Sequence, residues 1–281
     1  MRALVCPGQG SQKKGFLSPW LEIEGVREHL ERLSEAAGID LIHYGTEAEE
    51  ETIKDTAIAQ PLIVAAGIVT GRLALRELEG EELIFAGHSV GEITAAALAG
   101  VLSDEDAMRF VRVRANGMAE AAAASPTGMA AVLGGVEENV REAIDAAGLV
   151  AANSNGGGQI VAAGPIPAIE AFAANPPART RVIPLKVAGA FHTEAMAPAV
   201  PALEEFAASL QVSDPTSALL TNRDGSAVAS GEEFVKTLVS QVTSPVRWDL
   251  CMATLLEREV AGIIEVAPAG TLVGLAKRAM R

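Results

Sequence analysis

Short apolar runs that end in glycine-rich turns alternate along the chain with segments of helical periodicity. Residues 3–6 form one such run and residues 83–86 another, and each predicts a buried strand that opens into a turn. The second turn leads directly into a helix-forming run over 93–99. Apolar positions recur at helical spacing over 58–78. This succession of strands and helices predicts an α/β protein.

A different texture over residues 127–187 predicts a separate small unit. Its elements follow in the order strand, helix, strand, strand, helix, strand, which is typical of the ferredoxin-like fold. The expected elements are 129–133, 137–147, 149–152, 159–163, 166–174 and 180–187. We therefore expect a small ferredoxin-like domain, residues 126–188, inserted into a larger α/β domain made of residues 1–125 and 189–281.

Beyond this unit the pattern returns to helices and one strand. The periodicity predicts helices over 201–210, 231–242 and 248–258, a buried strand over 262–266, and a terminal helix. These elements complete the larger domain.

Composition excludes several classes of protein. Of the 281 residues, 49% are hydrophobic and 21% are charged, which fits a globular chain with a sizeable core. A net charge of −14 disfavours general binding to nucleic acid. The acid excess lies in the predicted larger domain, whereas the small domain is nearly neutral. The small domain carries Arg179, Arg181 and Lys186 near its end, and Lys277 and Arg278 lie in the predicted terminal helix.

The two cysteines, Cys6 and Cys251, form no C-x-x-C pair, and no His and Cys cluster has metal-ligand spacing. We expect no disulfide framework, no metal site and a reducing compartment. The apolar run at 3–6 is too short for a signal peptide. The uncharged stretch 56–71 is shorter than a membrane span. These features predict a cytoplasmic protein that does not enter the membrane.

The turn after the second strand carries candidate chemistry. Residues 87–91 read Gly-His-Ser-Val-Gly, the G-x-S-x-G pattern, between a predicted strand and a predicted helix. Such a tight turn exposes the serine hydroxyl, and the amides at the helix start favour a developing oxyanion. We interpret Ser89 as a nucleophile, in preference to a purely structural glycine turn.

A nucleophilic serine needs a base, and the chain has four histidines. His29 and His43 lie among acidic residues on predicted surface helices, where solvated side chains are expected. The sharp turn should direct His88 away from Ser89, into packing. His192 remains, where the chain returns from the small domain, and we predict that it is the base for Ser89.

The third member of a Ser-His-acid triad is missing. Asp104 and Asp106 lie near a helix start, and Asp145 lies inside a helix of the small unit. None follows a strand, as the acid of such a triad would. We therefore predict a Ser-His dyad whose histidine is oriented by a group other than a carboxylate.

The chain resembles the malonyl-CoA:acyl carrier protein transacylases, the FabD-type family related to polyketide synthase acyltransferase domains. The resemblance extends over essentially the whole chain and depends on an ordered set of motifs. They are PGQGSQ at 7–12, GHSVGE at 87–92, RVRANGM at 112–118, GAFH at 189–192, SPVRW at 244–248 and EVAPAG at 265–270. The implied fold is an α/β-hydrolase-like large domain with an inserted ferredoxin-like small domain.

The resemblance also implies a role for each site residue. It makes Ser89 the nucleophile and His192 its general base. It makes the backbone amides of Gln9 and Val90 the oxyanion hole. It makes Arg114 the clamp for the free carboxylate of the malonyl group.

Two further positions follow from the resemblance. The main-chain carbonyl of Gln241 would orient the histidine. Phe191 stands where related acyltransferases differ by substrate, and an aromatic ring there is associated with malonyl rather than methylmalonyl.

The implied activity is ping-pong transfer of a malonyl group from malonyl-CoA, through a seryl ester, to the phosphopantetheine thiol of acyl carrier protein. The setting would be fatty-acid or polyketide synthesis, with no bound cofactor or metal, in a monomer. A serine thioesterase or esterase with the same elbow is the alternative among enzymes. A non-catalytic module that docks carrier proteins is the alternative from another class.

Overall fold

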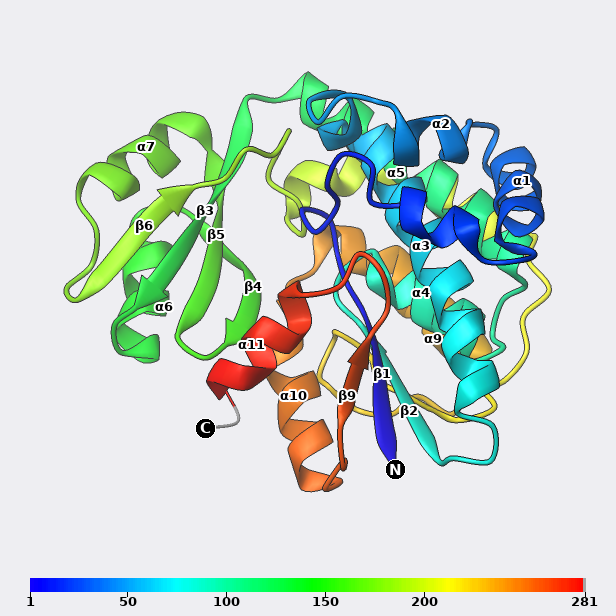
Figure 1. Cartoon of the computed structure of the whole chain (residues 1–281). Helices are drawn as coiled ribbons and strands as arrows, with labels where there is room; N and C mark the ends of the chain where they lie inside the picture. The colour runs from blue at the N-terminus through cyan, green and yellow to red at the C-terminus, as the bar shows by residue number, and fades with distance from the viewer. Residues whose placement is uncertain (280–281) are drawn as a thin grey trace.

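The computed structural model describes residues 1–279 as two β-sheets with helices packed on them (Figure 1). The strands are β1 (Arg2–Cys6), β2 (Leu83–Gly87), β3 (Thr127–Gly134), β4 (Val150–Gly156), β5 (Gln159–Pro165), β6 (Thr180–Pro184), β7 (Ala218–Leu219), β8 (Val246–Arg247) and β9 (Ile263–Glu265). The α-helices are α1 (Val26–Ala37), α2 (Leu41–Thr46), α3 (Thr56–Glu77), α4 (Gly91–Leu98), α5 (Asp104–Ala124), α6 (Glu137–Ala146), α7 (Ile166–Ala174), α8 (Val200–Ala208), α9 (Gly231–Ser240), α10 (Trp248–Glu257) and α11 (Thr271–Ala279). Short 3₁₀ helices are η1 (Ser18–Glu22), η2 (Thr52–Lys54), η3 (Glu194–Ala199) and η4 (Gln241–Thr243). The α/β class predicted from the sequence is confirmed.

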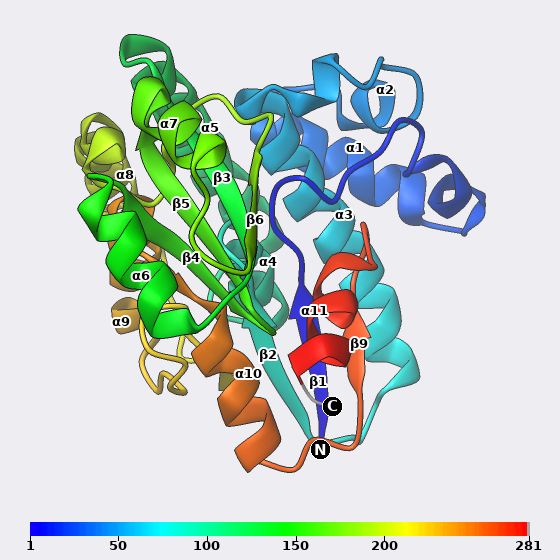
Figure 2. The ribbon, with the colours of Figure 1, turned by 90° about the vertical axis from the view of Figure 1, so that its left-hand side faces the viewer.

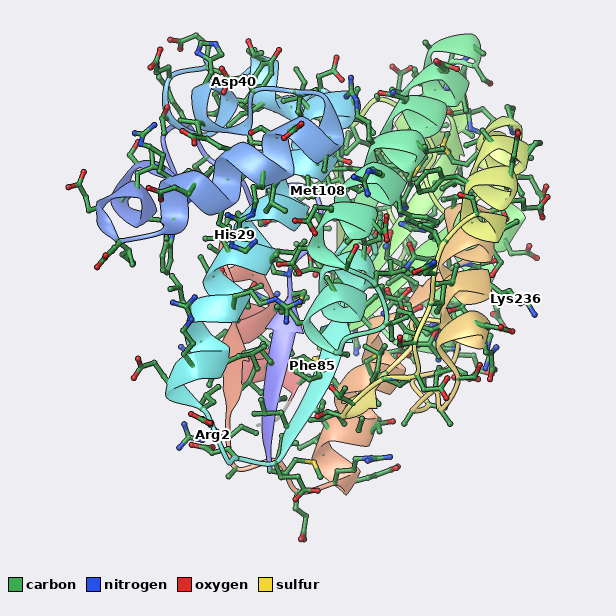
Figure 3. All side chains as sticks on the ribbon, turned by 90° about the vertical axis from the view of Figure 1, so that its right-hand side faces the viewer. Arg2, His29, Asp40, Phe85, Met108 and Lys236 are labelled. Carbon is green, nitrogen blue, oxygen red and sulfur yellow. The ribbon has the colours of Figure 1, made fainter. Side chains whose placement is uncertain are left out.

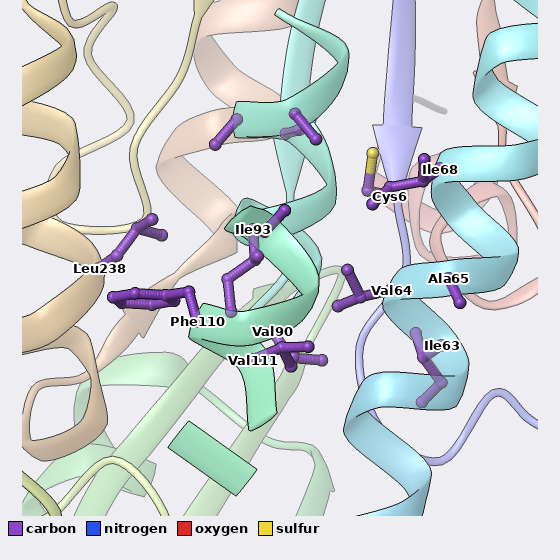
Figure 4. Close-up of a cluster of buried hydrophobic side chains, with 14 of the residues drawn as sticks. Cys6, Ile63, Val64, Ala65, Ile68, Val90, Ile93, Phe110, Val111 and Leu238 are labelled. Atoms are coloured by element: carbon purple, nitrogen blue, oxygen red, sulfur yellow. The ribbon is translucent and has the colours of Figure 1, made fainter. Parts of the chain in front are cut away.

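The first sheet is parallel, in the order β7-β2-β1-β9. Helices α3 and α4 cover one face, and α10 and α11 cover the other, so β1 and β2 are buried on both sides. This burial explains their continuous apolar sequence. Figure 4 shows the packing on one face, where Cys6 of β1 lies next to Ile68 of α3, and Phe110 of α5 lies next to Leu238 of α9.

The carboxyl ends of β1 and β2 bring two distant turns together. Cys6 and Gly87 are register partners, and the His88 N–H donates to the Cys6 carbonyl at 2.9 Å. Parallel strands end at the same edge of a sheet, so the turn that holds Gln9 lies beside the turn that holds Ser89. The fold thus joins the two motifs that the sequence separates by about eighty residues.

The second sheet has the order β6-β3-β5-β4-β8. Helices α6 and α7 cover its outer face (Figure 2), where Val132, Ile144 and Phe172 are buried. The opposite face, with Met129 and Val161, packs on the main core. The six elements expected over 127–187 are all present in the predicted order.

Several expectations differ from the structure in detail. The two-residue strands β7 and β8 were not predicted, and β8 adds a parallel strand to β4 from outside the 126–188 segment. The strand expected over 180–187 ends at Pro184. The helix expected over 231–242 ends at Ser240 and continues as the 3₁₀ turn η4. The strand expected to be buried at 262–266 is only half-buried in β9.

Helix α3 has 22 residues and extends beyond the uncharged stretch 56–71. It is the one helix within residues 1–279 that is long and apolar enough to cross a membrane by length and composition. Of its most apolar window, 72% is buried inside the protein, and a helix that is apolar on all sides is expected in such a core. Figure 3 shows the contrast between inside and outside, with Phe85 and Met108 in the interior and Lys236 at the surface.

The contact between β1 and α4 depends on glycine. A Cβ on Gly91 would lie 2.1 Å from the Cys6 carbonyl oxygen, whereas a Cβ on Gly274 in α11 would meet no atom within 4 Å. We expect Gly91→Ala to destabilise the protein by about 2 kcal/mol or more, because backbone blocks the methyl group. Gly274→Ala should stabilise it by about 0.5–1 kcal/mol through helix propensity. Denaturant unfolding measures both, and equal stability of the two variants would contradict this packing.

Candidate active site

Ser89 occupies a strained turn between β2 and α4. Its φ is 53°, in the left-handed region that non-glycine residues rarely adopt. The Ser89 N–H donates to Asn222 Oδ1 at 2.8 Å, and the Asn222 amide nitrogen donates to the Gly87 carbonyl at 2.7 Å. Asn222 thus fixes both sides of the turn. Strain of this kind persists where surrounding contacts over-determine the backbone, and it is common at functional sites.

His192 lies against Ser89, as the sequence predicts. Its Nε2 is 2.7 Å from Ser89 Oγ, and its Nδ1 is 2.8 Å from the main-chain carbonyl oxygen of Gln241. A carbonyl can only accept, so Nδ1 carries the proton and Nε2 presents its lone pair to the hydroxyl. The predicted contact with the Gln241 carbonyl is therefore present. His192 also has a positive φ, 63°.

The imidazole of His192 is held in its neutral form. Burial, together with the smaller effect of the positive charge of Arg114, lowers its pKa to about 3. The side chain is only 3% exposed. A neutral imidazole hydrogen-bonded to a hydroxyl can accept the hydroxyl proton.

Arg114 projects from α5 into the same site. It is 1% exposed, its Nη1 donates to Gln60 Oε1 at 2.7 Å, and its Nη2 donates to Gln241 Oε1 at 2.9 Å. Nη2 also lies 3.4 Å from Ser89 Oγ. Burial lowers the pKa of Arg114 to about 10, which leaves it charged at neutral pH. The site thus holds a buried cation next to a hydroxyl.

Four contributions to this site were missed in the sequence: the side chains of Gln60, Glu92, Asn222 and Gln241. Glu92 immediately follows the G-x-S-x-G pattern, so its position in the first turn of α4 was a signal that could have been used. Gln60 and Asn222 carry no local signal, because tertiary packing alone brings them to Ser89. All four residues are buried.

The main-chain N–H groups of Gln9 and Val90 are the two amides predicted to bind an oxyanion. Within the described residues neither donates a hydrogen bond, and both belong to the adjacent turns after β1 and β2. Gln9, Ser89, Phe191 and His192 line a cavity of about 300 Å³. A larger cavity of about 580 Å³ lies between α8 and α9 and includes none of these residues. Ser89 and His192 therefore face the smaller cavity, which residues of both sheets line.

Comparison with known proteins agrees with this geometry. The model of the acyl transferase domain family matches residues 3–281. The chain belongs to the acyl transferase domain family.

Two named members of this family align with almost the whole chain. A malonyl CoA-acyl carrier protein transacylase of Mycobacterium tuberculosis is 52% identical over 283 residues, which cover 100% of this chain and 94% of the relative. The Escherichia coli K12 protein of the same name is 31% identical over 283 residues, which cover 98% of this chain and 92% of the relative.

Solved structures of this family share the fold. The crystal structure of MCAT from Mycobacterium tuberculosis superposes with a TM-score of 0.97 at 52% identity, covering 100% of this chain and 94% of the other. A malonyl-transacylase solved in complex with a type II polyketide acyl-carrier protein has a TM-score of 0.92 at 30% identity, covering 99% and 92%.

In this acyltransferase the other histidines have separate environments. His43 is exposed, as expected. His29 is not solvated: its side chain is 16% exposed and its Nε2 is 3.0 Å from Asp104 Oδ2, because α1 packs on α5. That expectation was wrong. His88 is buried, lies edge-to-face on Trp248 and donates from Nε2 to Asn155 Oδ1 at 2.8 Å.

The acids that the sequence offered lie in other contacts. Asp104 binds Arg72 and His29 at the start of α5, Asp106 pairs with Arg109, and Asp145 lies in α6. The partner of His192 Nδ1 is a carbonyl instead of any of these carboxylates. Cys6 and Cys251 are free and buried, and burial raises the pKa of both thiols well above their usual range.

The lowered pKa of His192 can be measured directly. We expect ¹⁵N-histidine spectra of the folded enzyme to show the His192 ring neutral from pH 8 down to pH 5. The folded pKa lies below the unfolded value near 6.5, so proton uptake by His192 should accompany acid unfolding. Assignment by comparison with His192→Gln identifies the signal. A His192 titration centred near pH 6.5 in the folded state would contradict the neutral dyad.

Proposed function

We propose that this chain is a malonyl-CoA:acyl carrier protein S-malonyltransferase that works through a Ser89–His192 dyad. The observation that carries the proposal is the buried guanidinium of Arg114, whose Nη2 lies 3.4 Å from Ser89 Oγ. An acyl group with a free carboxylate suits a nucleophile placed beside a buried cation. The names of the relatives support the same substrate.

In the first half-reaction His192 Nε2 takes the Ser89 proton while Oγ attacks the thioester carbonyl of malonyl-CoA. The carbonyl carbon becomes tetrahedral and its oxygen becomes an oxyanion, which the N–H groups of Gln9 and Val90 bind. Each of these two hydrogen bonds stabilises the transition state by about 3 kcal/mol. The carbon–sulfur bond then breaks, and the CoA thiolate leaves with the proton from His192. The products are the malonyl-Ser89 ester and CoA.

The second half-reaction runs the same chemistry in reverse. The phosphopantetheine thiol of acyl carrier protein gives its proton to His192 and attacks the ester carbonyl. Ser89 Oγ leaves and takes the proton back. The carbonyl oxygen of Gln241 keeps Nδ1 protonated in both halves, so it is Nε2 that exchanges the proton.

Arg114 also links substrate charge to the base. Its positive charge lowers the pKa of His192 in the free enzyme. A malonyl carboxylate paired with the guanidinium opposes that charge, which raises the pKa of His192 and makes it a stronger base. An acetyl group lacks this carboxylate, so it makes no bidentate contact with the Arg114 guanidinium and does not raise the basicity of His192.

Phe191 supports a preference for malonyl over methylmalonyl. It lines the cavity next to His192 and is 6% exposed. An α-methyl branch on the acyl group would crowd the ring, and a methyl-sized difference is worth about 1–3 kcal/mol. Selectivity should therefore be strong but incomplete.

The same proposal includes a description of the domains. Residues 1–125 and 189–281 would form an α/β-hydrolase-like large domain, and 126–188 an inserted ferredoxin-like small domain. The strand order β6-β3-β5-β4 and the helices α6 and α7 support the second part. The chain would act as a cytoplasmic monomer that needs no bound cofactor or metal and does not bind nucleic acid or membrane. Acyl carrier protein, an anionic partner, would dock along the cleft between the two domains, guided by the basic side chains of Arg179, Arg181 and Lys186.

Intact-mass labelling tests the proposed function. Wild-type protein incubated with malonyl-CoA should gain one malonyl group, and addition of holo acyl carrier protein should remove it as malonyl-carrier protein. Ser89→Ala should gain none, because the ester oxygen is absent. Malonyl-CoA should label faster than methylmalonyl-CoA or acetyl-CoA.

Two results would contradict the proposal. Stoichiometric labelling of Ser89→Ala would place the acyl group elsewhere. Release of free malonate as the main product, with holo carrier protein present, would favour the thioesterase. Asp106→Asn, on an exposed pair with Arg109, serves as the matched control and should label like wild type.

A further inference from the structure

A buried carboxylate lies beneath the nucleophile and has no part in the steps above. Glu92 is 1% exposed in the first turn of α4, three residues after Ser89. Its Oε1 accepts from the Asn222 main-chain N–H at 2.6 Å, and its Oε2 accepts from Nε2 of Gln241. Burial raises its pKa to about 7. A group this costly to bury calls for an explanation.

The side chain of Gln241 connects Glu92 to Arg114. Its Nε2 donates to Glu92 and to the Ser89 carbonyl at 3.1 Å, while its Oε1 accepts from Arg114 Nη2. Within residues 1–279 no direct ion pair joins Glu92 and Arg114. The amide therefore lies between a buried anion and a buried cation, and only one of its two orientations satisfies both.

We propose that Glu92 is a positioning residue for Arg114: its carboxylate fixes the orientation of the Gln241 amide, which in turn holds the guanidinium beside Ser89. This inference rests on the proposed function, because it assigns Glu92 to the recognition of the malonyl carboxylate. Glu92 acts on specificity through Gln241 and does not touch the acyl group.

A change from carboxylate to amide should break this arrangement without removing volume. In Glu92→Gln the new Oε1 must still accept from the Asn222 N–H, so the new NH₂ faces the NH₂ of Gln241. If Gln241 turns over instead, its NH₂ faces Arg114, and the Ser89 carbonyl loses its donor. Either way two donors oppose one another, and unpaired buried polar groups are costly.

The test compares malonyl with acetyl transfer to Ser89 at pH 8, by single-turnover labelling. We expect Glu92→Gln to lower the ratio of malonyl to acetyl labelling rates by about tenfold, since the guanidinium is no longer held for the carboxylate. The control is Asp104→Asn, which removes another partly buried carboxylate on the helix that carries Arg114. Its ratio should stay within twofold of wild type even where its melting temperature falls.

A drop in the ratio of less than threefold for Glu92→Gln would overturn the proposal, because a merely structural glutamate would slow both acyl groups alike. If Glu92→Gln does not fold, Glu92→Asp decides by the same criterion, since the shorter carboxylate keeps its charge but cannot reach the Gln241 amide while it accepts from the Asn222 N–H. Wild-type protein that fails to label with malonyl-CoA would count against the proposed function, separately from the role of Glu92.

Discussion

The structure around Ser89 depends on one buried guanidinium. A charge as deeply buried as that of Arg114 is destabilising unless its N–H groups find acceptors and its field finds a counter-charge. Gln60 from α3 and Gln241 from η4 supply amide oxygens, and Glu92 from α4 supplies the negative charge. The helices on one face of the parallel sheet, together with η4, therefore supply the acceptors and the counter-charge that stabilise the Arg114 guanidinium.

The parallel sheet determines where that guanidinium meets the nucleophile. Because β1 and β2 end in register, the Gln9 and Ser89 turns share one edge of the sheet. The second sheet closes the cavity from the other side, and the segment that leaves it delivers His192. β8 follows η4 in the chain and joins the second sheet by pairing with β4. The proposed oxyanion donors, the proposed base and the buried cation thus come from four separate parts of the sequence.

Local signals were enough to predict much of this arrangement. The strand, elbow and helix around Ser89 and the six elements of the second sheet could be read from apolar patterning and turn residues. The two-residue strands could not be predicted, because sheet pairing at β7 and β8 depends on tertiary contacts.

The pattern could not distinguish Arg114 from its neighbours either. Arg109 pairs with Asp106 at the surface, and Arg112 donates to a carbonyl of α3. The resemblance to a family selected Arg114, whereas burial and hydrogen bonding explain its position. His29 shows the reverse case: its acidic neighbours in the sequence suggested a solvated side chain, but packing against α5 leaves it only 16% exposed.

A crystal structure of the malonyl-Ser89 enzyme tests the central claim most directly. The account predicts that the malonyl carboxylate lies within hydrogen-bonding distance of the Arg114 guanidinium, about 2.7–2.9 Å for a charge-assisted pair. It predicts the ester carbonyl oxygen at the N–H groups of Gln9 and Val90. A carboxylate bound away from Arg114, with the guanidinium still held by Gln60 and Gln241 alone, would contradict it.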